Sequence, residues 1–139
     1  MRLRIAQIAL ATAALLVAAF LTWERARGRA APCPIGGGGC ETVAQSRWSE
    51  LGGIPVSVFG MAGAATFLAT FAWRSALAVP ARFTIAGIGA VFSLYLTFLE
   101  ATEIHAYCIY CLGSAAAWCL LALLSGAETA RSSAAATTA

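Results

Sequence analysis

Charge is scarce in this sequence of 139 residues, of which only 11% are charged and 60% are hydrophobic. Lysine is missing, histidine occurs once, and all nine basic residues are arginine. The net charge of +3 is small and scattered, which argues against a nucleic-acid-binding surface. The apolar content exceeds the share of about half that is usual in globular proteins. We therefore expect one small domain that lies in a membrane.

Four apolar stretches come near the roughly 20 residues that a helix needs to cross about 30 Å of hydrocarbon. They are residues 5–23, 55–73, 83–105 and 107–124. A short link over 74–82 would make the middle two antiparallel neighbours, and their glycines and alanines would let helices pack closely in lipid. The sequence predicts an all-α membrane protein, with a bundle of four transmembrane helices in residues 1–126. A disordered tail rich in Ala, Ser and Thr is expected over 127–139.

The first extramembrane loop combines a flexible part with a helical part. Residues 24–34 are polar and rich in arginine, and the four glycines of 36–39 favour a mobile loop. Residues 41–51 have one apolar and one polar side, which predicts a short interfacial helix over the mouth of the bundle. Gly52 and Gly53 would end this helix. Pro55 would then begin the second span in a first-turn position.

The orientation follows from the thiols rather than from the arginines. With a cytoplasmic N-terminus, five arginines lie inside and four outside, which is a weak positive-inside signal. Paired thiols belong in an oxidising compartment, so we expect a multi-pass plasma or inner membrane protein with both cysteine pairs at the outer face. Residues 1–31 also resemble a cleavable signal peptide. Cleavage would leave three spans, and we favour a retained helix.

The two cysteine pairs differ in their surroundings. Cys108 and Cys111 form a C-x-x-C at the start of the last predicted helix, where free N–H groups and the helix dipole stabilise a thiolate. Cys33 and Cys40 flank the glycine run, so their sulfurs could bond to each other or reach another partner. Because exchange proceeds through a mixed disulfide, a mobile pair above a fixed pair predicts a two-step redox relay. Structural disulfides are the alternative.

A relay needs a terminal acceptor, and Cys111 lies one turn into the helix, toward the bilayer. A membrane quinone takes up the two electrons and two protons that a dithiol releases. Side chains that could line its pocket, or simply pack the bundle, are Phe59, Phe92, Tyr95 and Tyr110. Glu100, an acid late in the third span, is either functional or interfacial. We interpret Cys119 as a small buried hydrophobe and His105 as a polar helix end.

Several of these residues together resemble the vitamin K epoxide reductase family over residues 10–124. They are Cys33, Cys40, Val43, Ser46-Arg47-Trp48, Gly53-Ile54-Pro55, Phe59-Gly60 and Cys108-x-x-Cys111, and the stretch from Phe92 to Leu96 with Glu100 is similar to bacterial members. The resemblance implies a four-helix bundle around a quinone, either menaquinone or ubiquinone, and no metal. Cys108 and Cys111 would be the active pair, with Cys111 next to the quinone ring.

The resemblance also implies an order for the relay. Cys40 would exchange with Cys108, and Cys33 would face a thioredoxin-like disulfide donor, while Ser46 would help to order the loop helix. Bacterial members often carry the thioredoxin-like domain in the same chain, and here we expect a separate partner. The implied activity is quinone-linked thiol oxidation that supports disulfide formation in exported proteins.

Epoxide reduction is not expected. The enzymes that reduce the vitamin epoxide have an asparagine and a tyrosine at the positions of Val56 and Ala115.

Other interpretations remain. A non-catalytic membrane protein could hold zinc with four cysteines, but the glycine-rich gap between Cys33 and Cys40 is not zinc-knuckle spacing. The other bacterial quinone-linked disulfide generator carries its C-x-x-C in the first loop, whereas here it opens the last helix. The direction of electron flow stays open, because the same relay run backward would reduce substrates.

Overall fold

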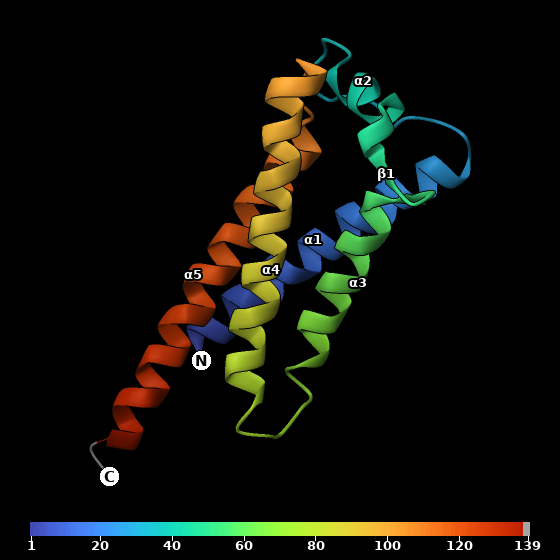
Figure 1. The fold of residues 1–139 in the computed structure, drawn as a ribbon. Coiled ribbons are helices and arrows are strands. Elements are labelled where there is room, and N and C mark those ends of the chain that lie inside the picture. Colours follow the sequence, from blue (N-terminus) through green and yellow to red (C-terminus); the bar gives the residue numbers. More distant parts are fainter. Residues whose placement is uncertain (138–139) are drawn as a thin grey trace.

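The computed structural model describes residues 1–137, and most of them are helical (Figure 1). The long helices are α1 (Arg2–Ala26), α3 (Val56–Ala69), α4 (Ala78–Leu99) and α5 (Ile109–Thr137). Shorter elements join them: α2 (Gly39–Gln45), the 3-10 turn η1 (Arg47–Ser49), the strands β1 (Glu50–Leu51) and β2 (Ile54–Pro55), and the π-helix η2 (Glu100–Ile104). In Figure 1, α2 and the α4–α5 junction lie at one end of the bundle, and the α3–α4 link lies at the other.

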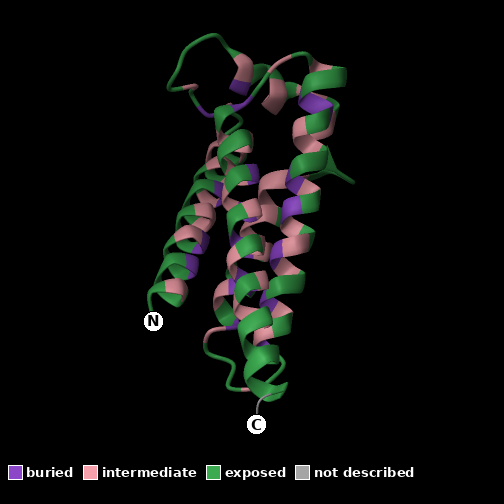
Figure 2. Ribbon diagram, turned by 90° about the vertical axis from the view of Figure 1, so that its left-hand side faces the viewer, coloured by how far each residue is buried: buried purple, intermediate pink, exposed green. Residues whose placement is uncertain are grey.

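The helices pack as two pairs, α4 with α5 and α1 with α3, and α1 also touches α5. Small side chains dominate the contact, which allows close approach in lipid. The core cluster comprises Ala11, Ala64, Phe67, Ala86, Ala90, Trp118 and Leu121. Buried residues line the facing sides of the helices, and exposed ones cover the outside (Figure 2). Many exposed side chains are large and apolar, among them Val91 and Leu123, as expected for a surface that faces lipid.

Three helices have the length and apolarity of membrane spans: α1, α4 continued by η2, and α5. The sequence predicts four spans. The remaining helix, α3, has 14 residues, which is about 21 Å at 1.5 Å per residue. It ends at Ala69 rather than at residue 73, and the chain then forms turns.

The segment predicted as one interfacial helix over 41–51 has a different structure. Its helix is α2, which starts earlier, at Gly39, and ends at Gln45. The Ser46 hydroxyl donates a hydrogen bond to the Val43 carbonyl oxygen at 2.8 Å, closing the last turn of α2. After η1 the chain forms a tight hairpin, in which Glu50 pairs with Pro55 and Leu51 with Ile54.

The hairpin turn explains the glycine pair that follows Leu51. Gly52 and Gly53 have φ values of +61° and +83°, and a two-residue turn with two positive φ angles strongly favours glycine. Pro55 is therefore the last residue of β2 and caps α3, instead of lying in the first turn of that helix.

The link predicted over 74–82 is shorter, because α4 already begins at Ala78. Pro80 consequently lies in the first turn of α4, where its missing N–H has no helical partner to lose. Arg82, expected in the link, belongs to the helix and is only 2% exposed.

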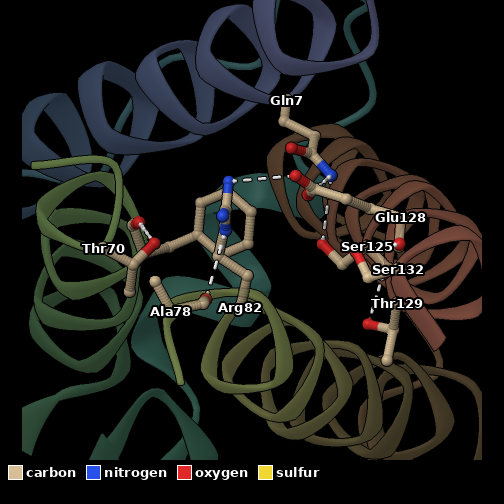
Figure 3. A network of polar contacts seen from close by, with 9 residues as sticks. Gln7, Thr70, Ala78, Arg82, Ser125, Glu128, Thr129 and Ser132 are labelled. Atoms are coloured by element: carbon tan, nitrogen blue, oxygen red, sulfur yellow. Dashed lines mark hydrogen bonds and ion pairs between the residues drawn. The ribbon is translucent and has the colours of Figure 1, made fainter. Parts of the chain in front are cut away.

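A polar network accounts for the burial of Arg82 at the end of the bundle opposite the cysteines (Figure 3). Its Nη1 lies 3.5 Å from the Glu128 carboxylate of α5, and its guanidinium lies 4.5 Å from the centre of the Phe71 ring. Gln7 of α1 donates to Glu128 at 3.3 Å and to Ser125 at 3.4 Å. The network ties α1, α4 and α5 together.

The C-terminal segment also differs from the sequence prediction of a disordered tail over 127–139. Helix α5 continues to Thr137, and residues 138 and 139 lie outside the described part of the chain. Alanine is the best helix former, and the contacts of Glu128 with α1 and α4 hold this part of α5 on the bundle.

A matched pair of glycines in α4 tests the packing against α5. A Cβ on Gly89 would overlap the Trp118 ring, whereas a Cβ on Gly87 would meet nothing within 4 Å. Alanine in a helix interior is otherwise favoured over glycine by roughly 0.5–1 kcal/mol, and overpacking costs about 1–3 kcal/mol. We expect Gly89→Ala to lower the thermal unfolding midpoint of the detergent-solubilised protein and Gly87→Ala to keep or raise it. Equal midpoints for the two variants would contradict this packing.

Candidate active site

Two cysteine pairs meet at the end of the bundle that carries α2 and η2. Cys33 and Cys40 form a disulfide, and Cys108 and Cys111 are free thiols. Cys40 and Cys108 are buried, whereas Cys33 and Cys111 are partly exposed. Cys40, Cys108 and Cys111 line one cavity of about 100 Å³, which we call the upper cavity.

A close approach of two backbone segments brings the pairs together. A Cβ on Gly39 would overlap the carbonyl oxygen of Tyr107. Cys40 and Cys108 directly follow these two residues, so the first turn of α2 lies against the start of α5. The hydroxyl of Tyr110 adds a second tie, because it donates a hydrogen bond at 2.9 Å to the carbonyl of residue 32, next to the first pair.

Arg25, in the last turn of α1, binds the part of the loop that follows Cys40 and holds it over the bundle. Its Nη1 donates a hydrogen bond to the Ala44 carbonyl at the end of α2 at 2.9 Å, and its guanidinium pairs with Glu50 of β1. The loop is thus held from α1 as well as from α5, which limits where Cys40 can lie.

Cys108 directly precedes the first residue of α5, the position from which a side chain accepts the free N–H groups of a helix. A hydrogen bond from the Cys111 thiol lowers the pKa of Cys108 to about 7, and the N–H groups of Cys111 and Tyr110 act in the same direction. Burial and the nearby Glu100 carboxylate oppose these effects on the pKa. Near neutral pH a large share of Cys108 is therefore thiolate, the form that takes part in exchange.

A second, larger cavity of about 640 Å³ lies below the first, between α1, α3, α4 and α5. Cys111 lines both cavities, and so does Ser57 of α3. The walls of the lower cavity are mainly apolar, with isolated hydroxyl groups such as those of Thr66 and Ser114. This size and lining are typical of sites for small organic ligands, and they fit a quinone ring beside Cys111.

Comparison with known proteins agrees with this geometry. The sequence profile of the Vitamin K epoxide reductase family matches residues 5–125. The chain belongs to this family. It is also similar to the thiol-disulfide oxidoreductase LTO1 of Arabidopsis thaliana, with 33% identity over 112 residues. The match covers 73% of this chain and 30% of the plant protein, so the chain spans less than a third of that relative. Family, relative and the bonded cysteine pair together support a thiol oxidoreductase.

The structure places most of the residues that the sequence selects around the two cavities of this family member. Ser46 lines the upper cavity. Phe59, Phe92 and Tyr110 line the lower one, and Tyr110 borders both. Tyr95 is 50% exposed and borders neither of these two cavities.

Two further residues that the sequence singles out, His105 and Cys119, lie outside the two cavities. His105 is exposed and has φ +53°, so it reverses the chain at the end of η2. Cys119 is partly buried and packs against the hydrophobic core. Within residues 1–137 no group of three or more His, Cys, Asp or Glu side chains could hold a metal ion.

Sequence reasoning misses two contributors to the site and the contact of a third. Gly39 is one of four consecutive glycines, and nothing in the sequence distinguishes the one that needs to lack a side chain. Ser57 is hydrogen-bonded to Thr22 of α1 at 2.9 Å and borders both cavities. Glu100 stands out in the sequence as an acid in an apolar stretch, but its contact with Cys108 spans eight residues and a change of helix.

The contact of Gly39 with Tyr107 yields a prediction for electron transfer between the pairs. Gly39→Ala should push α2 away from α5, and a displacement of about 1 Å at a reacting centre can slow a reaction about 100-fold. In a Cys111→Ser background, we expect at least about tenfold slower formation of a Cys40–Cys108 disulfide, measured by peptide mass spectrometry. Gly36→Asn is the control, since asparagine tolerates its positive φ and the space around it is open. Similar effects of both variants would contradict the contact.

The lowered pKa of Cys108 predicts the pH dependence of its reactivity. With Cys108 and Cys111 reduced, alkylation of Cys108 by iodoacetamide should reach half its maximal rate near pH 7 and should fall as Cys108 is protonated below that pH. Cys111→Ala removes the main cause of the shift, so its midpoint should move up, toward the ordinary range of thiols. Cys119→Ala, deeper in α5, should keep the wild-type midpoint. An unchanged midpoint in Cys111→Ala would disprove the thiol hydrogen bond.

Proposed function

We propose that this family member is a quinone-linked thiol-disulfide oxidoreductase. It carries electrons from a thioredoxin-like protein through Cys33 and Cys40, then through Cys108 and Cys111, to a membrane quinone, either menaquinone or ubiquinone. This reaction would support disulfide formation in exported proteins. The observation that carries the proposal is the position of Cys111, which borders both the cavity of the cysteine pairs and the large apolar cavity.

In the first step, a thiolate of the partner attacks Cys33 in the Cys33–Cys40 disulfide. The partner leaves as a disulfide, and Cys33 and Cys40 become thiols. Two features support Cys33 as the point of attack: it is partly exposed, while Cys40 is 4% exposed. The backbone N–H of Cys40, which donates to the Cys33 sulfur at 3.2 Å, would stabilise charge on that sulfur.

In the second step, Cys40 attacks Cys108 in a Cys108–Cys111 disulfide and releases Cys111 as a thiolate. Cys33 then resolves the mixed disulfide, which restores the Cys33–Cys40 bond and leaves Cys108 and Cys111 reduced. The observed state, with the first pair bonded and the second pair free, corresponds to the moment after this transfer.

In the last step, the second pair becomes a disulfide again and gives up two electrons. A quinone held in the lower cavity would supply an acceptor for two electrons and two protons. Phe59 and Phe92 would flank its ring, and Tyr110, which borders both cavities, would keep the ring next to Cys111. The mainly apolar wall would keep water away from the sulfurs.

The arrangement of α3 supports four spans in place of the three that length alone identifies. Helix α3 leaves the cysteine end of the bundle, and α4 starts from the opposite end (Figure 1). With α1, α4 and α5 crossing the bilayer, α3 needs to cross as well to keep both cysteine pairs on one side. We propose the plasma or inner membrane, with both pairs at the outer face, α2 at the interface, and one catalytic domain over 1–126.

The proposal predicts different losses for the outer and the inner cysteine. Cys111→Ala should abolish quinone reduction by the detergent-solubilised protein with any electron donor, because no other thiol borders the lower cavity within residues 1–137. Cys33→Ala should lose reduction driven by a thioredoxin-like dithiol and keep reduction driven by a small dithiol. The readout is the ultraviolet absorbance change of the quinone.

Cys119→Ala serves as the control, because it removes a thiol of the same helix that borders neither cavity. It should reduce quinone at the wild-type rate. Wild-type activity in Cys111→Ala would refute the relay.

A further inference from the structure

Glu100 is the buried acid of the candidate site. It lies at the junction of α4 and η2 and is 1% exposed. Its Oε2 accepts a hydrogen bond from the backbone N–H of Cys108 at 3.1 Å. The Cys111 side chain also interacts with this carboxyl group, whose Oε1 has no hydrogen-bond partner among the described residues. One carboxyl group thus contacts both members of the second pair.

No cation compensates this carboxyl group in the described part of the chain. Arg25 and Arg29 border the same cavity, but they form ion pairs with Glu50 and Glu24. Burying a carboxyl group without a paired charge and with one unsatisfied oxygen is unfavourable. Burying Glu100 in this way lowers the stability of the fold. A role in the reaction of the neighbouring cysteines therefore explains the position of this acid better than a structural role does.

The chemistry of the second pair leaves one proton to be moved. The lowered pKa of Cys108 favours its thiolate, so a reduced pair with one proton carries that proton on Cys111. Closure of the disulfide requires that proton to leave Cys111. The group that accepts this proton has to contact Cys111 within the protein, because the lower cavity, which Cys111 also borders, is mainly apolar.

We propose that Glu100 is a catalytic residue that accepts the proton of Cys111 as the Cys108–Cys111 disulfide closes and passes it to the reduced acceptor. This inference rests on the proposed function. The step balances: the Cys108 thiolate, the Cys111 thiol, one further proton and a quinone give a Cys108–Cys111 disulfide and a quinol. The S–H bond of Cys111 breaks, an S–S bond forms, the pair loses two electrons, and the quinone gains two electrons and two protons.

The fold holds the carboxyl group ready for this role. The wide turn of a π-helix often occurs at functional sites, and η2 begins at Glu100. The hydrogen bond from the Cys108 N–H keeps one oxygen fixed, and the other has no hydrogen-bond partner among the described residues. The charged and titratable groups that border the upper cavity with Glu100 are Arg25 of α1, Arg29 in the loop after α1, Cys40 of α2, and Cys108, Tyr110 and Cys111 at the start of α5.

Glu100→Gln tests the proposal, because an amide oxygen can still accept the Cys108 N–H but cannot take up a proton. We expect quinone reduction to slow about 100-fold, the lower end of the usual effect of a general base. A Cys111→Ser, Glu100→Gln double variant should still accumulate the Cys40–Cys108 disulfide, since positioning is retained. Glu103→Gln is the matched control: Glu103 lies in the same π-helix, its side chain is 51% exposed, and it faces Arg47. It should behave as wild type.

A second readout needs no quinone. Electrochemical oxidation of the Cys108–Cys111 pair should produce an infrared difference band of a protonated glutamic acid, present in wild type and Glu103→Gln and absent in Glu100→Gln. Should Glu100→Gln fail to fold, labelling with carbon-13 glutamate shows that the wild-type band belongs to a glutamic acid, and Glu100→Asp, which keeps a carboxyl group, should shift the frequency of that band. Absence of any glutamic-acid band, or a wild-type rate and spectrum in Glu100→Gln, would overturn the proposal.

The two proposals fail in different ways. If the wild-type protein reduces quinone and Cys111→Ala does not, while Glu100→Gln matches wild type, the role of Glu100 is wrong and the relay stands. If the wild-type protein reduces no quinone, the relay to quinone is wrong, and the infrared band still decides whether Glu100 takes the proton.

Discussion

Two backbone segments touch where Gly39 lies against the carbonyl oxygen of Tyr107, and the proposed relay depends on that contact. A disulfide on a loop can exchange with a second cysteine pair only if the two sulfurs to be joined can come within bonding distance. Cys40 and Cys108 are the next residues along their segments, so a side chain on Gly39 would separate the reacting sulfurs. The hydrogen bonds of Tyr110 and Arg25 hold the loop in this position.

The two ends of the bundle use buried charge in opposite ways. At the end away from the cysteines, Arg82 is paired with Glu128, and Gln7 joins the network from α1. This ion pair and the contacts of Gln7 join three helices, and breaking a buried pair is destabilising. At the cysteine end, Glu100 is buried with no ion pair in the described residues and with one unsatisfied oxygen. The first arrangement stabilises the bundle, and the second leaves a carboxyl group available for proton transfer.

The two cavities differ in the polarity of the residues that line them. The small upper cavity is lined by Cys40, Cys108, Cys111, Glu100 and two arginines, while the larger lower cavity is mainly apolar. Cys111 belongs to both, which makes it the point where thiol exchange and lipid-soluble chemistry can meet. The proposed relay would begin from a docked loop, because Cys40, Cys108 and Cys111 line the same cavity.

Local patterns predicted part of this structure well. Apolar length predicted α1, α4 and α5, since a long apolar stretch has few alternatives to a helix in lipid. The start of α4 was misplaced, because Pro80 and Arg82 look like a link when the partner of Arg82, Glu128, lies far along the chain. Similarly, the polar and apolar alternation of 41–51 fits a helix, and the turn closed by Ser46 ends it early.

The sequence by itself determined that the chain enters a membrane and that it carries two cysteine pairs, one of them at a helix start, because apolar length and C-x-x-C spacing are properties of neighbouring residues. Only the tertiary structure decided that Gly39 touches Tyr107, that Cys111 borders two cavities, and that Glu100 reaches the second pair. These contacts join residues from different elements. Their existence depends on how the helices pack, and no local pattern contains that information.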